Sequence, residues 1–270
     1  MRAAVVGHVE WVEFASVERV PSAGEITQAR ETWAEAAGGG GVAAVRLVQL
    51  AGACTLFTAL GQDEAGERAL EQLRSLGVRV EAARRQEPQR RGFTFLDDAG
   101  ERTITIIGEK HIPLGDDPLP WPELAEADAV YFVSGDVAAV RAARRARVLV
   151  ATARVLPVLA DAAVRLDALV RSASDPSERY EAGDLDPPPA LAVATAGAAG
   201  GRWTAVDGRA GTYEPVQPSA PVADSYGAGD TFAAGLTYAL AWGDGTEDAL
   251  EFAAGQASAA ITRRGAHGTR

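Results

Sequence analysis

The sequence is poor in cysteine and histidine, which limits the chemistry it can carry. The single cysteine, Cys54, lies in the apolar run CTLFTAL and cannot form an internal disulfide, so we interpret it as a small buried hydrophobic residue. The histidines His8, His111 and His267 are far apart and none is near Cys54, so the chain has no zinc-binding spacing. It also lacks the Gly-x-Ser-x-Gly nucleophile elbow.

Positive charge and long apolar runs are also scarce. The net charge of −11 over 270 residues argues against a nucleic-acid partner. The longest apolar runs are shorter than 18 residues, and the opening MRAAVVGHVEW is unlike a signal peptide, so we expect a cytoplasmic protein with no membrane partner. The one lysine, Lys110, follows a glutamate, which excludes a P-loop ending in Gly-Lys-Ser/Thr.

Short buried strands alternate with helical patterns along most of the chain. The predicted strands lie at 3–7, 54–61, 127–135, 147–153, 166–172 and 190–197, with a hairpin at 201–216. The predicted helices lie at 38–52, 64–78, 229–242 and 247–261. This order predicts a single α/β domain over residues 1–270, a three-layer sandwich with a mostly parallel central sheet.

Two further stretches, about 10–36 and 89–112, alternate apolar and polar residues more loosely. Within the second, residues 91–107 read as a hairpin that turns at Asp98-Ala99-Gly100. Because both stretches have the same half-exposed character, we expect them to pair into a small sheet outside the main one.

The segment VADSYGAGDTFAAGL, residues 222–236, carries the strongest chemical signal. The N–H groups that open a helix have no intrahelical partner and lie at the positive end of the helix dipole, so an anion can bind there. Gly227 and Gly229 would let it approach the main chain. Asp230 could then accept the proton of a hydroxyl that attacks a phosphorus atom. The alternative is that Asp230 only complements the helix dipole.

Two other glycine-rich stretches compete for a nucleotide. TAGAAGG, 195–201, offers a glycine turn after a strand, which is either a phosphate-binding turn or a plain β-turn. GGGGVAAV contains Gly38-x-Gly40-x-x-Ala43, a form of the dinucleotide fingerprint, with Asp63 following. The preceding TWAEAA is a poor buried strand, however, and a dinucleotide-dependent oxidoreductase would leave GAGD unexplained.

The order of these pieces resembles the ribokinase-like (PfkB) family of carbohydrate and nucleoside kinases over nearly the full chain. The resemblance rests on VVG, PSAGE (21–25), the glycine run (38–41), GQDEAG (61–66), TAGAAG (195–200), DSYGAGDTFAAGL (224–236) and FAAGQASAAITRRGA (252–266).

The resemblance implies a kinase that uses ATP and Mg²⁺ to phosphorylate a hydroxyl of a small sugar-like or nucleoside-like acceptor. Asp230 corresponds to the catalytic base, and Gly227, Ala228 and Gly229 to the anion hole that stabilises the transferring phosphoryl group. Thr195, Gly197, Gly200 and Gly265 correspond to nucleotide-binding positions. Gly38 and Gly39 correspond to acceptor-binding positions, and Asp224 to a contact with the acceptor or a monovalent cation such as K⁺. The outlying strands correspond to a lid over the acceptor, which implies a homodimer contact.

The chain also departs from the family pattern, which marks it as a divergent member. Val12 stands where the family has an aspartate, and Ala43 replaces an asparagine. The Asn-x-x-Glu motif has only Ser172-x-x-Asp175 as a nearest match.

Glu10, Glu13 and Asp136 are the carboxylates left to bind acceptor hydroxyls, and Asp136 follows a buried strand, where parallel sheets present their ligands. We therefore expect ribose and fructose to be poor substrates. The missing polar groups leave open a catalytically idle nucleotide- or sugar-binding protein of the same fold, although such a protein would not need Asp230.

Overall fold

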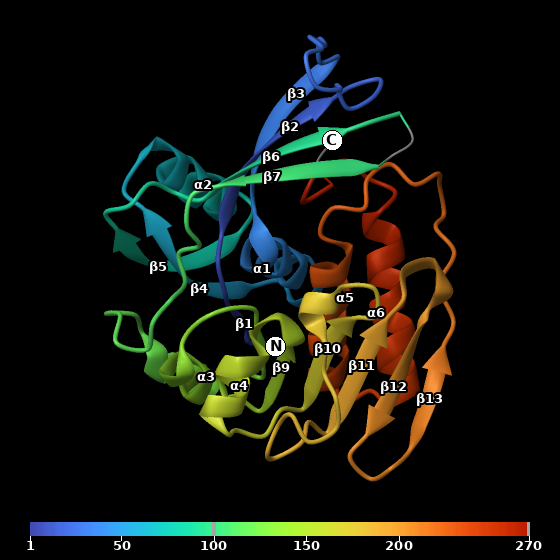
Figure 1. Ribbon diagram of the computed structural model, residues 1–270. Helices are drawn as coiled ribbons and strands as arrows, with labels where there is room; N and C mark the ends of the chain where they lie inside the picture. The colour runs from blue at the N-terminus through green and yellow to red at the C-terminus, as the bar shows by residue number, and fades with distance from the viewer. Residues whose placement is uncertain (99–100, 269–270) are drawn as a thin grey trace.

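The computed structural model describes residues 1–98 and 101–268, and within them nine strands form a central sheet (Figure 1). In order across the sheet, the strands are β13 (Ala210–Tyr213), β12 (Gly201–Ala205), β11 (Leu191–Thr195), β10 (Ala168–Ser172), β9 (Val148–Thr152), β8 (Ala129–Phe132), β1 (Ala3–Val6), β4 (Cys54–Gly61) and β5 (Val78–Arg85). The pairings from β5 to β11 are parallel, and only the edge hairpin of β12 and β13 is antiparallel.

Helices cover both faces of this sheet, which confirms the predicted three-layer arrangement. One face carries α1 (Gly38–Ala51), α2 (Glu64–Ser75), α5 (Ala228–Trp242) and α6 (Thr246–Ala260). The other face carries α3 (Val137–Ala143), α4 (Leu156–Ala162) and the 3₁₀ helix η1 (Trp121–Glu126). Shorter 3₁₀ turns are η2 (Ala153–Val155), η3 (Pro176–Glu178) and η4 (Gly197–Ala199).

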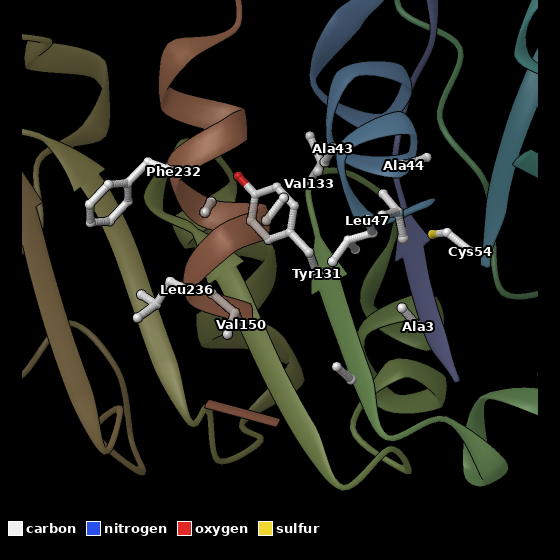
Figure 2. Packing of buried hydrophobic residues seen from close by; sticks show 14 of the residues in the cluster. Ala3, Ala43, Ala44, Leu47, Cys54, Tyr131, Val133, Val150, Phe232 and Leu236 are labelled. Carbon is white, nitrogen blue, oxygen red and sulfur yellow. The ribbon is translucent and has the colours of Figure 1, made fainter. Parts of the chain in front are cut away.

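The two cores follow from the alternation of side chains along the strands. In β1, Ala3 and Val5 belong to the cluster under α1 and α5, whereas Ala4 and Val6 belong to the cluster under α3 and α4. Both clusters are made largely of aliphatic side chains and alanine. Figure 2 shows part of the first cluster, where Tyr131 of β8 lies between Phe232 of α5 and Leu47 of α1.

A separate sheet stands above the main body, as the sequence predicted. Within the described chain it has four strands in the order β3-β2-β6-β7: β2 (Glu10–Ser16), β3 (Glu31–Ala37), β6 (Arg91–Leu96) and β7 (Arg102–Ile107) (Figure 1). We call this sheet the lid. The predicted turn at Asp98-Ala99-Gly100 involves residues 99–100, which lie outside the described residues.

The buried face of β6 is not the face that carries its aromatic residues. Phe93 and Phe95 form an edge-to-face pair on the half-exposed side, with ring centroids 5.0 Å apart. The buried side carries Gly92, Thr94 and Leu96. A Cβ on Gly92 would lie 3.2 Å from a methyl group of Val12, so the close approach of β2 selects a small residue there. The inner face of the lid is thus largely apolar.

The structure also contains α3, α4 and the edge strand β5, which the sequence patterns did not predict. The two helices have only seven residues each, which is too short for a helical period to be recognised. Strand β5 follows α2 almost directly and is mostly half-buried, so it lacks the apolar run of the inner strands. Among the helices of the described residues, none is both long enough and apolar enough to cross a membrane.

Candidate active site

The GAGD segment forms the start of α5, as predicted. Gly227 is the N-cap residue with φ +71°, a left-handed conformation that favours glycine. A Cβ there would also lie 2.8 Å from a methyl carbon of Val42 on α1. Thr231 N–H donates to the Gly227 carbonyl at 2.8 Å, so the N–H groups of 228–230 precede the first helical bond. A Cβ on Gly229 would meet nothing within 4 Å, so this turn is open to a ligand.

Asp230 lies half-buried in the first turn of α5, among groups that the sequence did not connect with it. The Tyr131 hydroxyl donates to its Oδ1 at 3.4 Å. Burial raises the pKa of Asp230 above its usual range, although the positive charge of Arg154 opposes this effect. A carboxylate with a raised pKa is a stronger proton acceptor once it is ionised, which suits a general base.

The N-terminus of α1 approaches the same carboxylate. A Cβ on Gly39 would lie 2.9 Å from Asp230 Oδ1 and 2.7 Å from a methyl group of Val133. Gly38 has φ +76°, and a Cβ added to it would lie 3.0 Å from the backbone nitrogen of Glu10. The structure thus brings Gly39 to Asp230 and Gly38 to Glu10, and the N-terminus of α1, with its partial positive charge, approaches the start of α5 at Asp230.

This contact gives a testable consequence for Gly39. We expect Gly39→Ala to destabilise the fold by about 1–3 kcal/mol, because the added methyl overpacks Val133 and displaces Asp230. Gly41→Ala is the matched control, because its Cβ would meet only ordinary contacts, the nearest at 3.5 Å. It should be neutral or stabilising by up to about 1 kcal/mol. Denaturant unfolding of both variants measures the difference, and equal stability would contradict the close packing of Gly39.

A second group of polar side chains lies where β1 passes into the lid. Glu10 is buried, and its Oε1 lies 2.8 Å from Arg90 Nε and 3.8 Å from His8 Nε2. Burial raises the pKa of Glu10, with Arg90 acting in the opposite direction. Burial also lowers the pKa of His8 well below its usual value, so His8 is neutral near pH 7. The negative charge of Asp230 also acts on Glu10 and raises its pKa further. Glu13, in contrast, pairs with Arg91, whose Nη1 lies 3.7 Å from Glu13 Oε1.

Arg154 and Glu178 form an ion pair beside Asp230 that the sequence analysis missed. Arg154 Nε donates to Glu178 Oε1 at 2.6 Å, and Ser172 N–H donates to Glu178 Oε2 at 2.6 Å. The charges of both residues act on Asp230. Arg154 lies in η2, two residues after the end of β9 at Thr152, so it stands at the carboxyl end of a parallel strand. The rule that singled out Asp136 applies equally to Arg154 and could have found it.

Three of the four predicted nucleotide residues line one groove of about 520 Å³ beside the N-terminus of α5. Its lining includes Thr195, Gly197 and Gly200 of the glycine turn and Ala228 and Gly229 at the start of α5. The rest of its lining is mostly apolar, with Val216, Val222, Phe232, Ala254, Ala257 and Ile261. An apolar groove that ends at a glycine turn and a helix N-terminus can hold a flat ring and the phosphates attached to it.

Gly265 and Asp224 have a structural contact with each other. The buried Asp224 accepts hydrogen bonds from Gly265 N–H at 3.0 Å and from Tyr226 N–H at 2.8 Å. A Cβ on Gly265 would lie 2.3 Å from a carboxylate oxygen of Glu35. Neither Gly265 nor Asp224 lines the groove. Their hydrogen bond instead connects the loop before α5 with the C-terminal segment.

Asp136 is occupied by the backbone. Its Oδ1 accepts from Ala139 N–H at 2.8 Å and from Gly115 N–H at 2.9 Å, which caps α3. Oδ1 of Asp136 therefore has a structural role at the start of α3.

No cluster of three or more metal-ligating side chains occurs in the described part of the chain. Two carboxylates interact electrostatically with Asp230: Glu178, whose oxygens are bound by Arg154 and Ser172, and Glu10, which pairs with Arg90. This donor set suits a metal ion that is held mainly by nucleotide phosphates, as Mg²⁺ commonly is, and does not suit an all-protein cage.

The chain belongs to the pfkB family of carbohydrate kinases, whose family profile matches residues 2–178 and 166–269. A comparison with curated proteins found no match.

Solved structures share the fold at low sequence identity. The ribokinase of Thermotoga maritima aligns with a TM-score of 0.77 at 19% identity, covering 98% of this chain and 94% of its own. The Arabidopsis thaliana ribokinase, solved with ribose and ATP, has a TM-score of 0.73 at 21% identity and coverages of 97% and 93%. The Methanocaldococcus jannaschii nucleoside kinase has a TM-score of 0.74 at 16% identity and coverages of 99% and 94%. At these identities the likeness establishes the ribokinase-like fold.

Proposed function

We propose that this protein transfers the γ-phosphoryl group of ATP to a hydroxyl of a small sugar-like or nucleoside-like acceptor. The observation that carries the proposal is the position of Asp230, which stands where the N-termini of α1 and α5 converge and next to the groove lined by Thr195, Gly197 and Gly200. Family membership supports the same reaction class. ATP is bound by a ribokinase of this fold, which supports the choice of nucleotide.

In the proposed reaction, the acceptor oxygen attacks the γ-phosphorus and Asp230 takes the hydroxyl proton. The new P–O bond forms as the bond to the β-phosphate oxygen breaks, and ADP leaves with that electron pair. The backbone N–H groups of Gly227, Ala228 and Gly229 would stabilise the charge on the transferring group. Arg154 would assist them, because its Nε binds Glu178 while no hydrogen bond from its two NH₂ groups occurs within the described residues.

Mg²⁺, when bound with the nucleotide, neutralises phosphate charge during transfer. Both oxygens of Glu178 accept hydrogen bonds from Arg154 and Ser172, so the nucleotide phosphates and water would supply most of the ligands of the ion in the absence of the Asn-x-x-Glu motif. Asp224 remains the proposed position for any effect of a monovalent cation such as K⁺, acting through the loop that it holds. A homodimer through the lid also remains a proposal, and the half-exposed Phe93 and Phe95 support it.

The alternative is a binding protein of the same fold that does not catalyse transfer. It is favoured by the apolar inner face of the lid, where Val12 and Leu96 are buried and Val12 stands at a position where the family has an aspartate. The raised pKa of Asp230 favours the kinase, because a binding protein gains nothing from a desolvated carboxylate beside phosphates.

ADP release from ATP and Mg²⁺, measured across sugars, polyols, nucleosides and sugar acids, tests the proposal. We expect turnover with at least one acceptor class and little with ribose or fructose, because Val12 and Ala43 offer no hydrogen bonds. For these two sugars kcat/KM should stay below about 10⁴ M⁻¹s⁻¹. Nucleotide binding without ADP release for any acceptor would favour the binding protein, and efficient ribose turnover would contradict the expected acceptor selectivity.

A further inference from the structure

Tyr131 is a buried titratable side chain that the proposed mechanism does not use. It belongs to β8, where the alternation of side chains turns Ala129 and Tyr131 to the face covered by α1 and α5. Tyr131 is only 2% exposed, and its ring lies in the apolar cluster with the oxygen directed toward α5 (Figure 2). A phenylalanine ring would fill the same space, so packing alone does not require a hydroxyl there.

The Tyr131 hydroxyl has one hydrogen-bond partner in the described part of the chain, which is Oδ1 of Asp230 at 3.4 Å. This distance is at the long end of the range for a hydrogen bond, and catalytic hydrogen bonds often shorten when substrate binds. A buried hydroxyl without any partner would destabilise the fold. The contact with Asp230 therefore compensates for burying this polar group in an apolar cluster.

Gly39 approaches the same oxygen of Asp230 from the N-terminus of α1. A Cβ on Gly39 would lie 2.9 Å from Oδ1 and 3.3 Å from Cγ of Asp230. For the second oxygen, Oδ2, no hydrogen bond occurs within residues 1–98 and 101–268. The two oxygens of the carboxylate therefore differ, because Oδ1 is in contact with α1 and β8, whereas Oδ2 has no protein donor and can face an acceptor.

We propose that Tyr131 positions the catalytic base: its hydroxyl holds Oδ1 of Asp230, so that Oδ2 is the oxygen that takes the proton of the acceptor hydroxyl. The acceptor oxygen bonds to the γ-phosphorus, its proton ends on Oδ2, and the bond to the departing ADP oxygen breaks. Tyr131 keeps its own proton throughout and acts only through Asp230. This role rests on the proposed function, because it requires Asp230 to be the base.

The hydrogen bond also affects how easily Asp230 ionises. Burial raises the pKa of Asp230, whereas the Tyr131 hydroxyl lowers it, because a donated hydrogen bond stabilises the carboxylate. The other groups that interact electrostatically with Asp230 are Arg154 of η2, Glu178 of η3, Arg102 of β7, Glu10 of β2, Tyr226 before α5 and Lys110 after β7. Tyr131→Phe keeps all of these groups, so a changed titration of Asp230 in that variant would follow from the lost hydroxyl.

The kinetics of Tyr131→Phe test the role directly. With the acceptor found by ADP release, we expect kcat at the pH optimum to fall on the order of 10- to 100-fold, because the carboxylate is no longer held in one orientation. KM for ATP should not change, since Tyr131 does not line the groove assigned to the nucleotide. The acid limb of the pH–rate profile should move upward, because loss of the hydrogen bond raises the pKa of Asp230.

Tyr238→Phe is the matched control for this variant. Tyr238 lies on α5 like Asp230, but its ring stacks on Trp242 and Phe252 near the other end of the helix. The control should leave kcat and the acid limb unchanged. If Tyr131 only fills the core, Tyr131→Phe will match this control in both readouts, and the positioning role will be wrong.

A second measurement needs no acceptor. The free energy of unfolding is measured from about pH 4 to about pH 8 for the wild type, Tyr131→Phe, Asp230→Asn and the double variant. Tyr131→Phe should lose stability relative to the wild type as the pH rises through the folded-state pKa of Asp230, because the ionised carboxylate then lacks its donor. In the Asp230→Asn background the effect of Tyr131→Phe should not depend on pH, since asparagine does not titrate.

The outcomes separate the role of Tyr131 from the proposed function. ADP release with the same kcat and the same acid limb in the wild type and Tyr131→Phe would overturn the positioning role and leave the kinase standing. An equal pH dependence of the Tyr131→Phe effect in both backgrounds would overturn the contact itself. Coupling between Tyr131 and Asp230 without ADP release for any acceptor would contradict the kinase and, with it, the catalytic role of the contact.

Discussion

Asp230→Asn should lower turnover on the order of 10²- to 10⁴-fold while leaving nucleotide binding intact. Asparagine keeps the shape of the side chain and its place in the first turn of α5, but it cannot accept the hydroxyl proton. The nucleotide phosphates would still have the N–H groups of 227–229 and the turn at 195–200. The affinity for ATP should stay the same or increase, because the variant removes a negative charge beside the γ-phosphate. Steady-state kinetics and calorimetry of ATP binding measure the two effects separately.

The stability of the same variant distinguishes a base from a dipole complement. Burial raises the pKa of Asp230, so the folded state disfavours its ionised form. The stabilising contribution of a group with a raised pKa is present at low pH and is lost as the pH rises through its folded-state pKa. Asp230→Asn should therefore be no less stable than the wild type near pH 7. A residue that only complements the dipole would give a loss of roughly 0.3–1 kcal/mol with unchanged turnover, and that result would sink the catalytic assignment.

Arg154→Met should lower kcat on the order of 10²- to 10³-fold, because it removes a preorganised donor to the transferring phosphoryl group. It should also move the acid limb of the pH–rate profile upward. The charge of Arg154 lowers the pKa of Asp230 against the effect of burial, so its removal lets that pKa rise further. The base would then be protonated, and activity lost, at a higher pH than in the wild type.

Arg154→Lys is the control for this variant. Lysine keeps the positive charge beside Asp230 and should keep the acid limb near its wild-type position, but it lacks the planar fork that binds Glu178 and a phosphoryl oxygen together. Its kcat should fall between those of the wild type and Arg154→Met. If Arg154 only supports the buried Glu178, Arg154→Met will melt at a lower temperature with an unshifted acid limb, and the proposed role will be wrong.

The local signals of the sequence predicted the frame of the molecule well. Every strand of the central sheet except β5 coincides with a predicted strand or hairpin, because strands of this kind are short apolar runs bounded by glycine, proline or charge. The lid strands were predicted from their looser alternation, but that pattern could not tell which face of β6 is buried. The choice of face depends on Val12 of β2, which approaches Gly92 across the sheet.

The candidate site was only partly predictable. Glycines 38, 39, 227 and 229 were found because a glycine-rich turn before a helix is a local pattern, and the structure brings Gly39 of the first turn against Asp230, which follows the second. Asp136 and Asp224 were found as carboxylates but bind backbone N–H groups, which depends on neighbours that a sequence pattern does not reveal. Arg154 was missed although it stands just after the end of β9, because the strand-end rule was used only to find carboxylates. Arg90 was missed because nothing in its own segment distinguishes it from a solvated surface charge.

The sequence by itself determined the order of most strands and helices, the small sheet outside the main one, and the glycine turn that precedes Asp230. These features depend on residues that are neighbours along the chain, whose propensities act locally. Only the tertiary structure decided which charges surround Asp230. Arg154 and Glu178 follow the parallel neighbours β9 and β10, whereas Glu10 begins the lid strand β2, so the pairing of distant segments carries these charges toward Asp230. Electrostatic interactions depend on distance in space, so the pKa of Asp230 became predictable only once these side chains had positions.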